Sequence, residues 1–149
     1  MKQLKSTTLI LLLISLSFLA CKKSSTSPPK TKTELITQNS WKFDNASAAG
    51  VGDVSSFIPD CYKDNVTVFA TGGTGTISEE ANICSPSTAG SFTWEFQSNE
   101  TVLHLSTALF SGGTGDFNLE SLTETNLVVS QTMTIAPYPS TTVTITFKH

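Results

Sequence analysis

The 149-residue chain contains no arginine, and lysine becomes scarce after residue 32. From residue 33 onward three lysines oppose all twelve acidic residues, so this part has a net charge of −9, although the whole chain has only −3. Such an acidic surface repels phosphate backbones, so we expect no nucleic-acid partner. Acidic and phosphorylated substrates are disfavoured for the same reason.

Histidine is also scarce, which leaves few groups for acid–base catalysis. His104 alternates out of phase with Leu103 and Leu105, so we expect it to face solvent, and His149 is the last residue. The sequence ties neither histidine to a nucleophile, which a catalytic site of this kind needs. We therefore expect no catalytic residue, no enzyme activity, no metal and no cofactor.

The acidic residues do not supply an obvious catalytic pair either. Glu79 and Glu80 are consecutive in an expected strand, so they point to opposite faces and are not a catalytic couple. Asp60, Asp64 and Asn65 form an oxygen-rich cluster. A weak calcium site is one interpretation of this cluster, and capping of the local turn is favoured over it.

Long apolar runs are missing except at the start of the chain. Lys2 and Lys5 precede an apolar segment that opens at Leu9 and ends near Ala20. A membrane span needs about 20 consecutive apolar residues, and this segment is shorter. We therefore interpret residues 1–20 as a secretory signal peptide.

The segment Phe18-Leu19-Ala20-Cys21 resembles the lipobox of bacterial lipoproteins. The resemblance implies that Cys21 carries a diacylglycerol and fatty acids such as palmitate, which hold the protein on a membrane without a protein span. The family pattern has Leu three residues before the cysteine and a small residue two before it, where this chain has Phe18 and Leu19.

Residues 21–32 are predicted to be the lipidated cysteine and a flexible tether, because they offer lysine, serine, threonine and proline but nothing to bury. By analogy with lipoprotein sorting, Lys22 in place of aspartate favours the outer membrane of the cell envelope. A tether without acidic residues favours its periplasmic leaflet over the cell surface.

Two cysteines remain once Cys21 is assigned to lipid. Cys61 and Cys84 lie 23 positions apart, and in an exported protein such a pair most simply forms a disulfide. Closing a loop of this length stabilises the fold by roughly 3 kcal/mol on the chain-entropy model. A metal site is the alternative, but no histidine or third cysteine lies near in the sequence.

Residues 33–149 are expected to form one domain, in which apolar residues alternate with period two. A short helix is predicted at 33–38, capped by Thr33 and ended by Asn39 in a left-handed conformation. Short turns and one apolar face per strand favour an all-β, eight-stranded antiparallel up-and-down barrel. The strands are predicted at 39–46, 65–70, 74–80, 90–97, 101–107, 115–122, 125–134 and 140–148.

The motif GGTG occurs twice, at 72–75 and 112–115. Each copy lies between two strand-like runs, and the run before the second copy extends to Phe110. Glycine supplies the positive φ that tight hairpins need. A phosphate loop would need a helix after the glycines, and both copies lead into strands instead. We therefore predict two hairpin turns.

The chain also resembles the lipocalin-like domains of small bacterial lipoproteins over most of residues 33–149. The matching features are a short helix before Asn39-Ser40-Trp41, the Cys-x-x-Asp-Asn element at 61–65 with a later cysteine, Trp94 on a strand, and the segment 117–122 before two final strands. The resemblance implies a barrel with an apolar interior. It further implies that Phe69 points inward and that Lys148 replaces the usual arginine over the tryptophan.

The interior is the place where a ligand would bind. The candidate ligand cavity consists of Phe69, Gly75, Ile77, Trp94, Phe96, Leu105, Leu119, Val129 and Ile145, and Phe92 and Phe147 complete the expected lining. Gly75 is expected to leave room inside. An eight-stranded barrel either holds one small ligand or fills with side chains.

Two functions follow from these alternatives. One is a lipid-anchored module that binds a small apolar ligand. The other is a structural or interaction module with a filled core, which would contact a protein or glycan through the long segment 46–64. Within that segment, 50–53 and 57–59 are expected to lie outside the regular strands.

Overall fold

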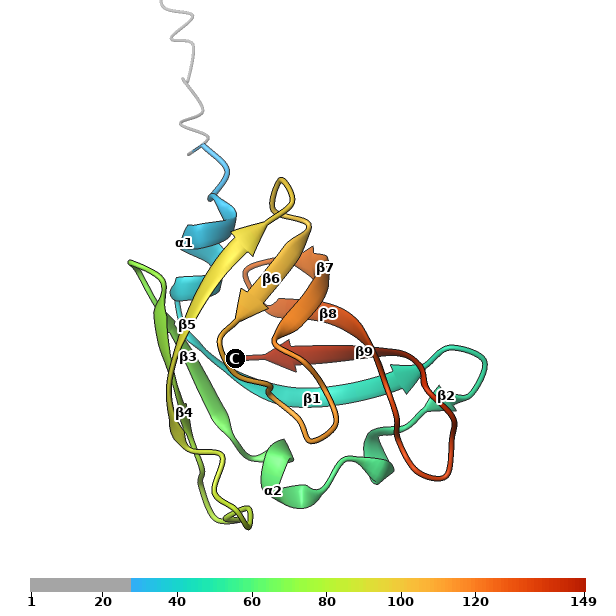
Figure 1. Cartoon of the computed structure of the whole chain (residues 1–149). Coiled ribbons are helices and arrows are strands. Elements are labelled where there is room, and N and C mark those ends of the chain that lie inside the picture. The colour runs from blue at the N-terminus through green and yellow to red at the C-terminus, as the bar shows by residue number, and fades with distance from the viewer. Residues whose placement is uncertain (1–27) are drawn as a thin grey trace, which may run out of the picture.

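The computed structural model describes residues 28–149 (Figure 1). The signal peptide predicted at 1–20, the lipidation site at Cys21 and the tether up to residue 27 lie outside the described residues. Within the described part, no helix is both long enough and apolar enough to cross a membrane.

The protein consists of one antiparallel sheet that closes on itself (Figure 1). Consecutive strands of the ring pair with one another, and pairing of its first strand with its last completes the ring. The two-residue β2 pairs with β1 beside the ring, which leaves eight strands in it, as the alternation of apolar residues predicted. The strands are β1 (Ser40–Ala48), β2 (Gly52–Asp53), β3 (Val66–Ala70), β4 (Thr74–Ser78), β5 (Gly90–Gln97), β6 (Val102–Leu105), β7 (Asp116–Leu122), β8 (Asn126–Met133) and β9 (Thr141–Lys148).

Three short helices accompany the sheet: α1 (Lys32–Thr37), the 3-10 turn η1 (Ser55–Phe57) and α2 (Asp60–Lys63). The caps predicted for α1 are wrong. A capping box of Thr31 and Glu34 starts the helix earlier than expected, because Thr31 precedes a glutamate at the required spacing. Asn39 does not have positive φ; in the described part, the residues other than glycine that do are 98–100.

The ring has two different ends, because its strands alternate in direction. We call one the helix end: it carries α1 and the turns at 71–73, 98–101 and 123–125. We call the other the loop end: it carries the longer connections 49–65, 79–89, 106–115 and 134–140. In Figure 1, α1 lies at the top and α2 at the bottom, on these opposite ends.

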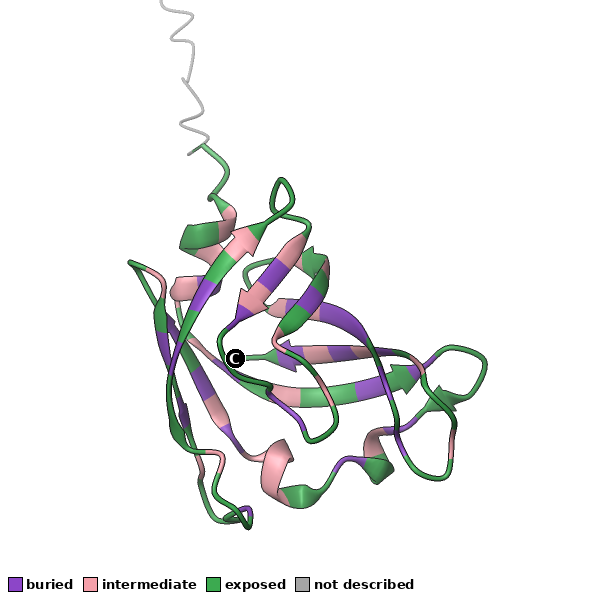
Figure 2. Ribbon diagram, in the orientation of Figure 1, coloured by how far each residue is buried: buried purple, intermediate pink, exposed green. Residues whose placement is uncertain are grey.

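Burial alternates along the strands, so that one face of each strand points into the ring (Figure 2). The direction of β3, which is apolar on both faces, is the one that the family resemblance implied. Phe69 is 2% exposed, whereas Val68 is 38% exposed. The turn 71–73 joins β3 to β4 with positive φ at Gly72 and Gly73, which confirms the first GGTG copy as a hairpin turn.

Candidate ligand site at the loop end

Side chains fill the middle of the ring. Of the predicted cavity residues, Phe69, Ile77, Trp94, Leu105, Val129 and Ile145 are all buried, and Phe96 and Leu119 pack partly buried against them. The Trp94 ring meets Phe69 and Phe96 edge-on, each with 5.6 Å between ring centroids. The residues predicted to line a cavity are thus brought together as a packed core.

Gly75 does not leave room inside the ring, contrary to the prediction. It lies opposite Phe92 on the neighbouring strand. A Cβ atom built on Gly75 would come within 2.3 Å of Phe92 Cζ and 2.6 Å of the Val68 carbonyl oxygen. The missing side chain therefore makes space for an aromatic ring from the next strand, and the ring occupies that space.

A loop from between two strands closes the loop end of the ring. The strand predicted at 101–107 ends at Leu105, and 106–115 forms a loop, which we call the plug loop. Its residues Leu109 and Phe110 are 9% and 5% exposed. The Phe110 ring lies near Phe43, Tyr62 and Phe147, with ring centroids 6.3, 5.7 and 6.1 Å away.

The sequence predicts a tight hairpin turn at the second GGTG copy, but this copy lies within the plug loop. The Gly113 N–H donates to the Phe110 carbonyl, forming a turn inside the loop. The neighbouring Thr114 N–H donates to Gln131 Oε1 on β8 at 2.8 Å. A Cβ on Gly113 would meet that amide oxygen at 2.9 Å, so this glycine lets the loop lie close against β8.

Two spaces flank the Phe110 ring. The inner hollow, of about 10 Å³, is lined by Tyr62, Asn65, Thr67, Ile77, Leu109, Phe110 and Phe147. It has room for about one water molecule. The mouth pocket, of about 190 Å³, is lined by residues that include Phe57, Ile58, Tyr62, Phe110, Met133 and Ile135. Tyr62 and Phe110 line both spaces and form the partition between them.

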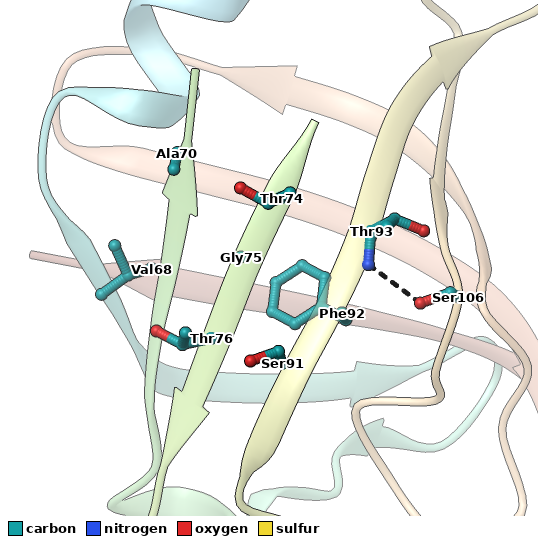
Figure 3. Close-up of a pocket in the computed structure, with 9 residues that line it drawn as sticks. All are labelled: Val68, Ala70, Thr74, Gly75, Thr76, Ser91, Phe92, Thr93 and Ser106. Atoms are coloured by element: carbon teal, nitrogen blue, oxygen red, sulfur yellow. Dashed lines mark hydrogen bonds between the residues drawn. The ribbon is translucent and has the colours of Figure 1, made fainter. Parts of the chain in front are cut away.

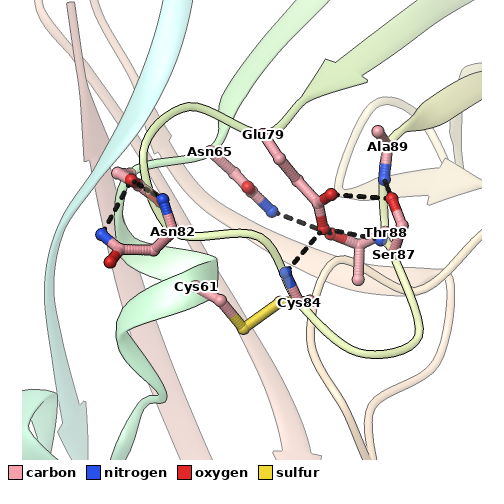
Figure 4. Close-up of a disulfide and its surroundings, with 9 residues drawn as sticks. Cys61, Asn65, Glu79, Asn82, Cys84, Ser87, Thr88 and Ala89 are labelled. Atoms are coloured by element: carbon pink, nitrogen blue, oxygen red, sulfur yellow. Dashed lines mark hydrogen bonds between the residues drawn. A yellow bond between two sulfur atoms is a disulfide. The ribbon is translucent and has the colours of Figure 1, made fainter.

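The disulfide Cys61–Cys84 forms as predicted and holds α2 to the connection 79–89 (Figure 4). It fixes the helix that carries Tyr62, the residue next to Cys61. The disulfide therefore supports one of the two rings of the partition.

A carboxylate next to the disulfide organises the same connection (Figure 4). Glu79 lies beyond the end of β4 and accepts hydrogen bonds from Cys84 N, Ser87 Oγ, Thr88 N and Thr88 Oγ1. The backbone bond from Thr88 and then the Ser87 hydroxyl are the main causes that lower the pKa of Glu79 from 4.5 to about 2. Glu79 is therefore a structural anion.

The sequence favours capping of the local turn by Asp60, Asp64 and Asn65, but these side chains do not cap it. Asp64 Oδ2 accepts from the backbone and side-chain nitrogens of Asn82 across the disulfide loop. Asp60 pairs with Lys63 at 2.9 Å. Among residues 28–149, no three His, Cys, Asp or Glu side chains are grouped as a metal site would require.

The segment 46–64 is more tightly attached than predicted. Gly52 and Asp53 form β2 against β1, while Val54 and Ile58 are 0% and 4% exposed. Val51 and Phe57 remain exposed, at 39% and 41%. These exposed side chains lie on the part of the segment that faces outward at the loop end.

A further hollow lies outside the ring, on β3, β4, β5 and the start of the plug loop (Figure 3). It measures about 560 Å³ and is lined by Val68, Ala70, Thr74, Gly75, Thr76, Ser91, Phe92, Thr93 and Ser106. These residues offer hydroxyl groups and small apolar groups but no charge. The Phe92 ring turns inward and is 4% exposed, so the hollow has no open aromatic face for stacking.

The helix end is closed by polar contacts around a buried tryptophan. Trp41 is fully buried, and its Nε1 donates to the Ile36 carbonyl at 2.8 Å. His149, not the expected Lys148, covers the indole, with 4.0 Å between ring centroids. Lys148 points elsewhere, because Asp44 holds its ammonium at 2.8 Å; this hydrogen bond lowers the pKa of Asp44.

His104 lies on the outer face of the sheet. His104 pairs with Asp116 on the neighbouring strand, and its side chain is 38% exposed. The pair lies outside the packed interior. The described contacts connect His104 to a carboxylate and to no nucleophile.

Comparison with known proteins places the fold in a class. No protein-family model matches the chain, and no curated protein matches its sequence. Among solved structures, Japanin from Rhipicephalus appendiculatus, a tick lipocalin-family protein bound to cholesterol, superposes with a TM-score of 0.51. The superposition has 12% sequence identity and covers 80% of this chain and 78% of Japanin. At this identity the likeness shows the fold alone: the chain has a lipocalin-like fold.

Sequence reasoning missed the residues that close the loop end, namely Tyr62, Leu109 and Phe110. The signal for the plug was present as an apolar pair just before a glycine-rich turn. A strand that continued to Phe110 would have pointed these two side chains to opposite faces. Both are buried instead, because the chain leaves the sheet at Ser106 and folds over the ring.

Proposed function

We propose that the protein is a non-enzymatic binding module, a lipocalin-like barrel that takes up a small apolar molecule at its loop end. The observation that carries this proposal is the apolar mouth pocket, which lies directly against the Phe110 ring. A ligand that displaced Phe110 would join the mouth pocket to the inner hollow and gain contact with Phe43 and Phe147. Burial of such apolar surface is worth about 25 cal/mol per Å² before the cost of moving the loop.

The cholesterol bound to Japanin supports an apolar ligand as the class to test. The barrel of the present protein has a filled middle. We therefore expect a ligand that is smaller than the barrel and binds near the mouth. Native mass spectrometry of the protein tests the proposal. Extra mass that is lost in organic solvent supports it, and a bare chain after exposure to a panel of apolar molecules contradicts it.

The proposal includes the cellular setting that the N-terminal residues predict. We propose that the chain is a lipoprotein of the bacterial cell envelope, anchored through Cys21 after removal of residues 1–20. α1, which follows the tether, lies at the helix end, opposite the mouth. Growth in labelled palmitate checks the anchor: incorporation should disappear in Cys21→Ala, and label retained by that variant would contradict it.

A second candidate function is favoured by the packed interior. A filled barrel that binds a protein or glycan would use exposed apolar groups, and Ile83, at 73% exposed, lies on the disulfide loop at the same end as Phe57 and Val51. Deletion of 50–58 would remove the buried Val54 and Ile58, so point variants are the better test. Loss of a co-purifying partner in Ile83→Ser and Phe57→Ser, with ligand-free protein throughout, would favour this function.

A further inference from the structure

One polar side chain faces the inner hollow with half of its amide unused. Asn65 immediately precedes β3 and is 8% exposed. It has the same alternation as the inward residues Thr67 and Phe69, and it lines the inner hollow. Its oxygen Oδ1 is buried and has no hydrogen-bond partner among the described residues. A buried acceptor left in this state costs free energy, so a matching donor would be bound favourably.

A chain of hydrogen bonds fixes which end of the amide is unused (Figure 4). A threonine hydroxyl has a single proton, and Thr88 Oγ1 donates it to the Glu79 carboxylate at 2.9 Å. Thr88 Oγ1 can then only accept, and it accepts from Asn65 Nδ2 at 3.1 Å. Glu79 is ionised throughout the physiological range because its pKa is about 2, so it does not return a proton to Thr88. The amide nitrogen is thus committed, and the oxygen is the free group.

The walls around this oxygen are mostly aromatic and aliphatic, and Thr67 adds a hydroxyl group. Tyr62, Phe110 and Phe147 lie on the same hollow, with Ile77 and Leu109. A ligand that displaced Phe110 would therefore meet mostly apolar side chains, with the free Asn65 acceptor and the hydroxyl groups of Thr67 and Tyr62 among them. This arrangement suits an amphiphile with an apolar chain or ring and one small donor group.

We propose that the ligand of this barrel carries a hydrogen-bond donor, as an alcohol or an amine does, and that Asn65 Oδ1 is the acceptor that selects it. The inference rests on the proposed function and names its ligand class. A carboxylate head has no proton to donate at neutral pH and would place its oxygens against Asn65 Oδ1. The net charge of −9 on residues 33–149 disfavours an anionic head in addition.

Four ligands with a ten-carbon chain test the inference on the full-length protein: decan-1-ol, decylamine, decyl methyl ether and decanoate. Their affinities are compared by displacement of the apolar fluorophore N-phenyl-1-naphthylamine. The ether replaces the hydroxyl proton of the alcohol with a methyl group, so the ratio of the two affinities reports the loss of the donor. We expect the alcohol and the amine to bind about tenfold more tightly than the ether and decanoate.

The variant Asn65→Leu then identifies the acceptor. It should reduce the alcohol-to-ether ratio to about one while retaining ether binding. Asn82→Leu is the matched control, because it removes another hydrogen-bonded amide at the same disulfide loop and should leave the ratio unchanged.

The outcomes separate the two levels of the proposal. If no ligand of the series binds, the proposed function itself is overturned. If ligands bind but the ether or decanoate equals the alcohol, the donor requirement is wrong and the binding function stands. An unchanged ratio in folded Asn65→Leu would overturn the role of Asn65. Should that variant not fold, the four-ligand series on the unaltered protein still decides whether a donor is required.

Discussion

The two ends of the ring are closed in different ways. At the helix end, Trp41 bonds to the nearby α1, and direct contacts join distant segments: His149 to Trp41 and to the Ser40 carbonyl, and Lys30 to Glu124. At the loop end, the plug loop is attached through the packing of Leu109 and Phe110 and through its contacts with Gln131. Several linked contacts would have to break together to open the helix end, whereas the plug loop that covers the mouth can open locally while the disulfide and the Glu79 network stay in place.

The difference indicates where a ligand can enter. Opening the helix end would require exposure of Trp41 and loss of several hydrogen bonds together. Opening the loop end requires movement of the plug loop, which contains three glycines at 112, 113 and 115. The following predictions test this contrast, from the largest expected effect to the smallest.

Truncation of the tryptophan at the helix end should cost most. Trp41→Ala removes a fully buried ring, its hydrogen bond to the Ile36 carbonyl and its contact with His149. We expect the free energy of unfolding to fall by about 3–5 kcal/mol, as is usual for large buried aromatics. Denaturant unfolding monitored by circular dichroism measures it. A loss as small as that of a surface substitution would show that α1 does not depend on this residue.

Loss of the disulfide should cost somewhat less. Cys61→Ser together with Cys84→Ser opens a loop of 23-residue separation and should lower the free energy of unfolding by roughly 3 kcal/mol on the chain-entropy model. The double variant should also bind an apolar fluorophore more readily, because α2 and Tyr62 are less restrained. Equal stability of oxidised and doubly substituted protein would contradict this prediction.

Removal of the Phe110 ring should lower the free energy of unfolding less than Trp41→Ala or loss of the disulfide does. It should also increase the affinity for an apolar ligand. In Phe110→Ala we expect a loss of about 2 kcal/mol, because the loop can settle into part of the space left behind. The mouth pocket and the inner hollow would then join, so an apolar ligand should bind more tightly. Calorimetric titration with decan-1-ol checks the gain, and unfolding measures the cost. Weaker binding in a folded Phe110→Ala would mean that Phe110 holds the ligand and does not block it.

Glu79→Gln is expected to have the smallest effect at neutral pH. Its effect should appear as a change in how the free energy of unfolding depends on pH. The folded pKa of about 2 lies below the ordinary 4.5, so the ionised carboxylate stabilises the fold above about pH 4.5. This contribution is lost as the pH falls from there towards 2. Glu79→Gln should therefore unfold with a flatter dependence on pH across that window. Parallel pH profiles for the two proteins would contradict the assignment.

The repeating part of the structure could be predicted from the sequence, because side-chain alternation directly reports strands. The eight strands of the ring overlap the predicted ranges, although β6 ends earlier than predicted, and Phe69 faces inward as the family resemblance implied. The pairing of Cys61 with Cys84 could also be predicted, because the expected export and the assignment of Cys21 to lipid left these two cysteines as a pair.

The closures of the two ends could not be predicted in the same way, because they depend on contacts between distant segments. His149 covers Trp41 since the ion pair with Asp44 directs Lys148 elsewhere, and no local pattern contains that competition. Phe92 fills the space at Gly75 because β4 and β5 pair in one particular register. The sequence has a strand-like run up to Phe110, but in the structure the chain leaves the sheet after Leu105.

The central claim is that the loop end opens for a ligand while the helix end remains closed. Hydrogen–deuterium exchange of the protein with and without decan-1-ol tests it most directly. Ligand binding should change the exchange of amides in the plug loop and around Asn65, and leave those of α1 and the turn 123–125 unchanged. A change confined to the helix end, or to the outer hollow on β3 to β5, would contradict the account.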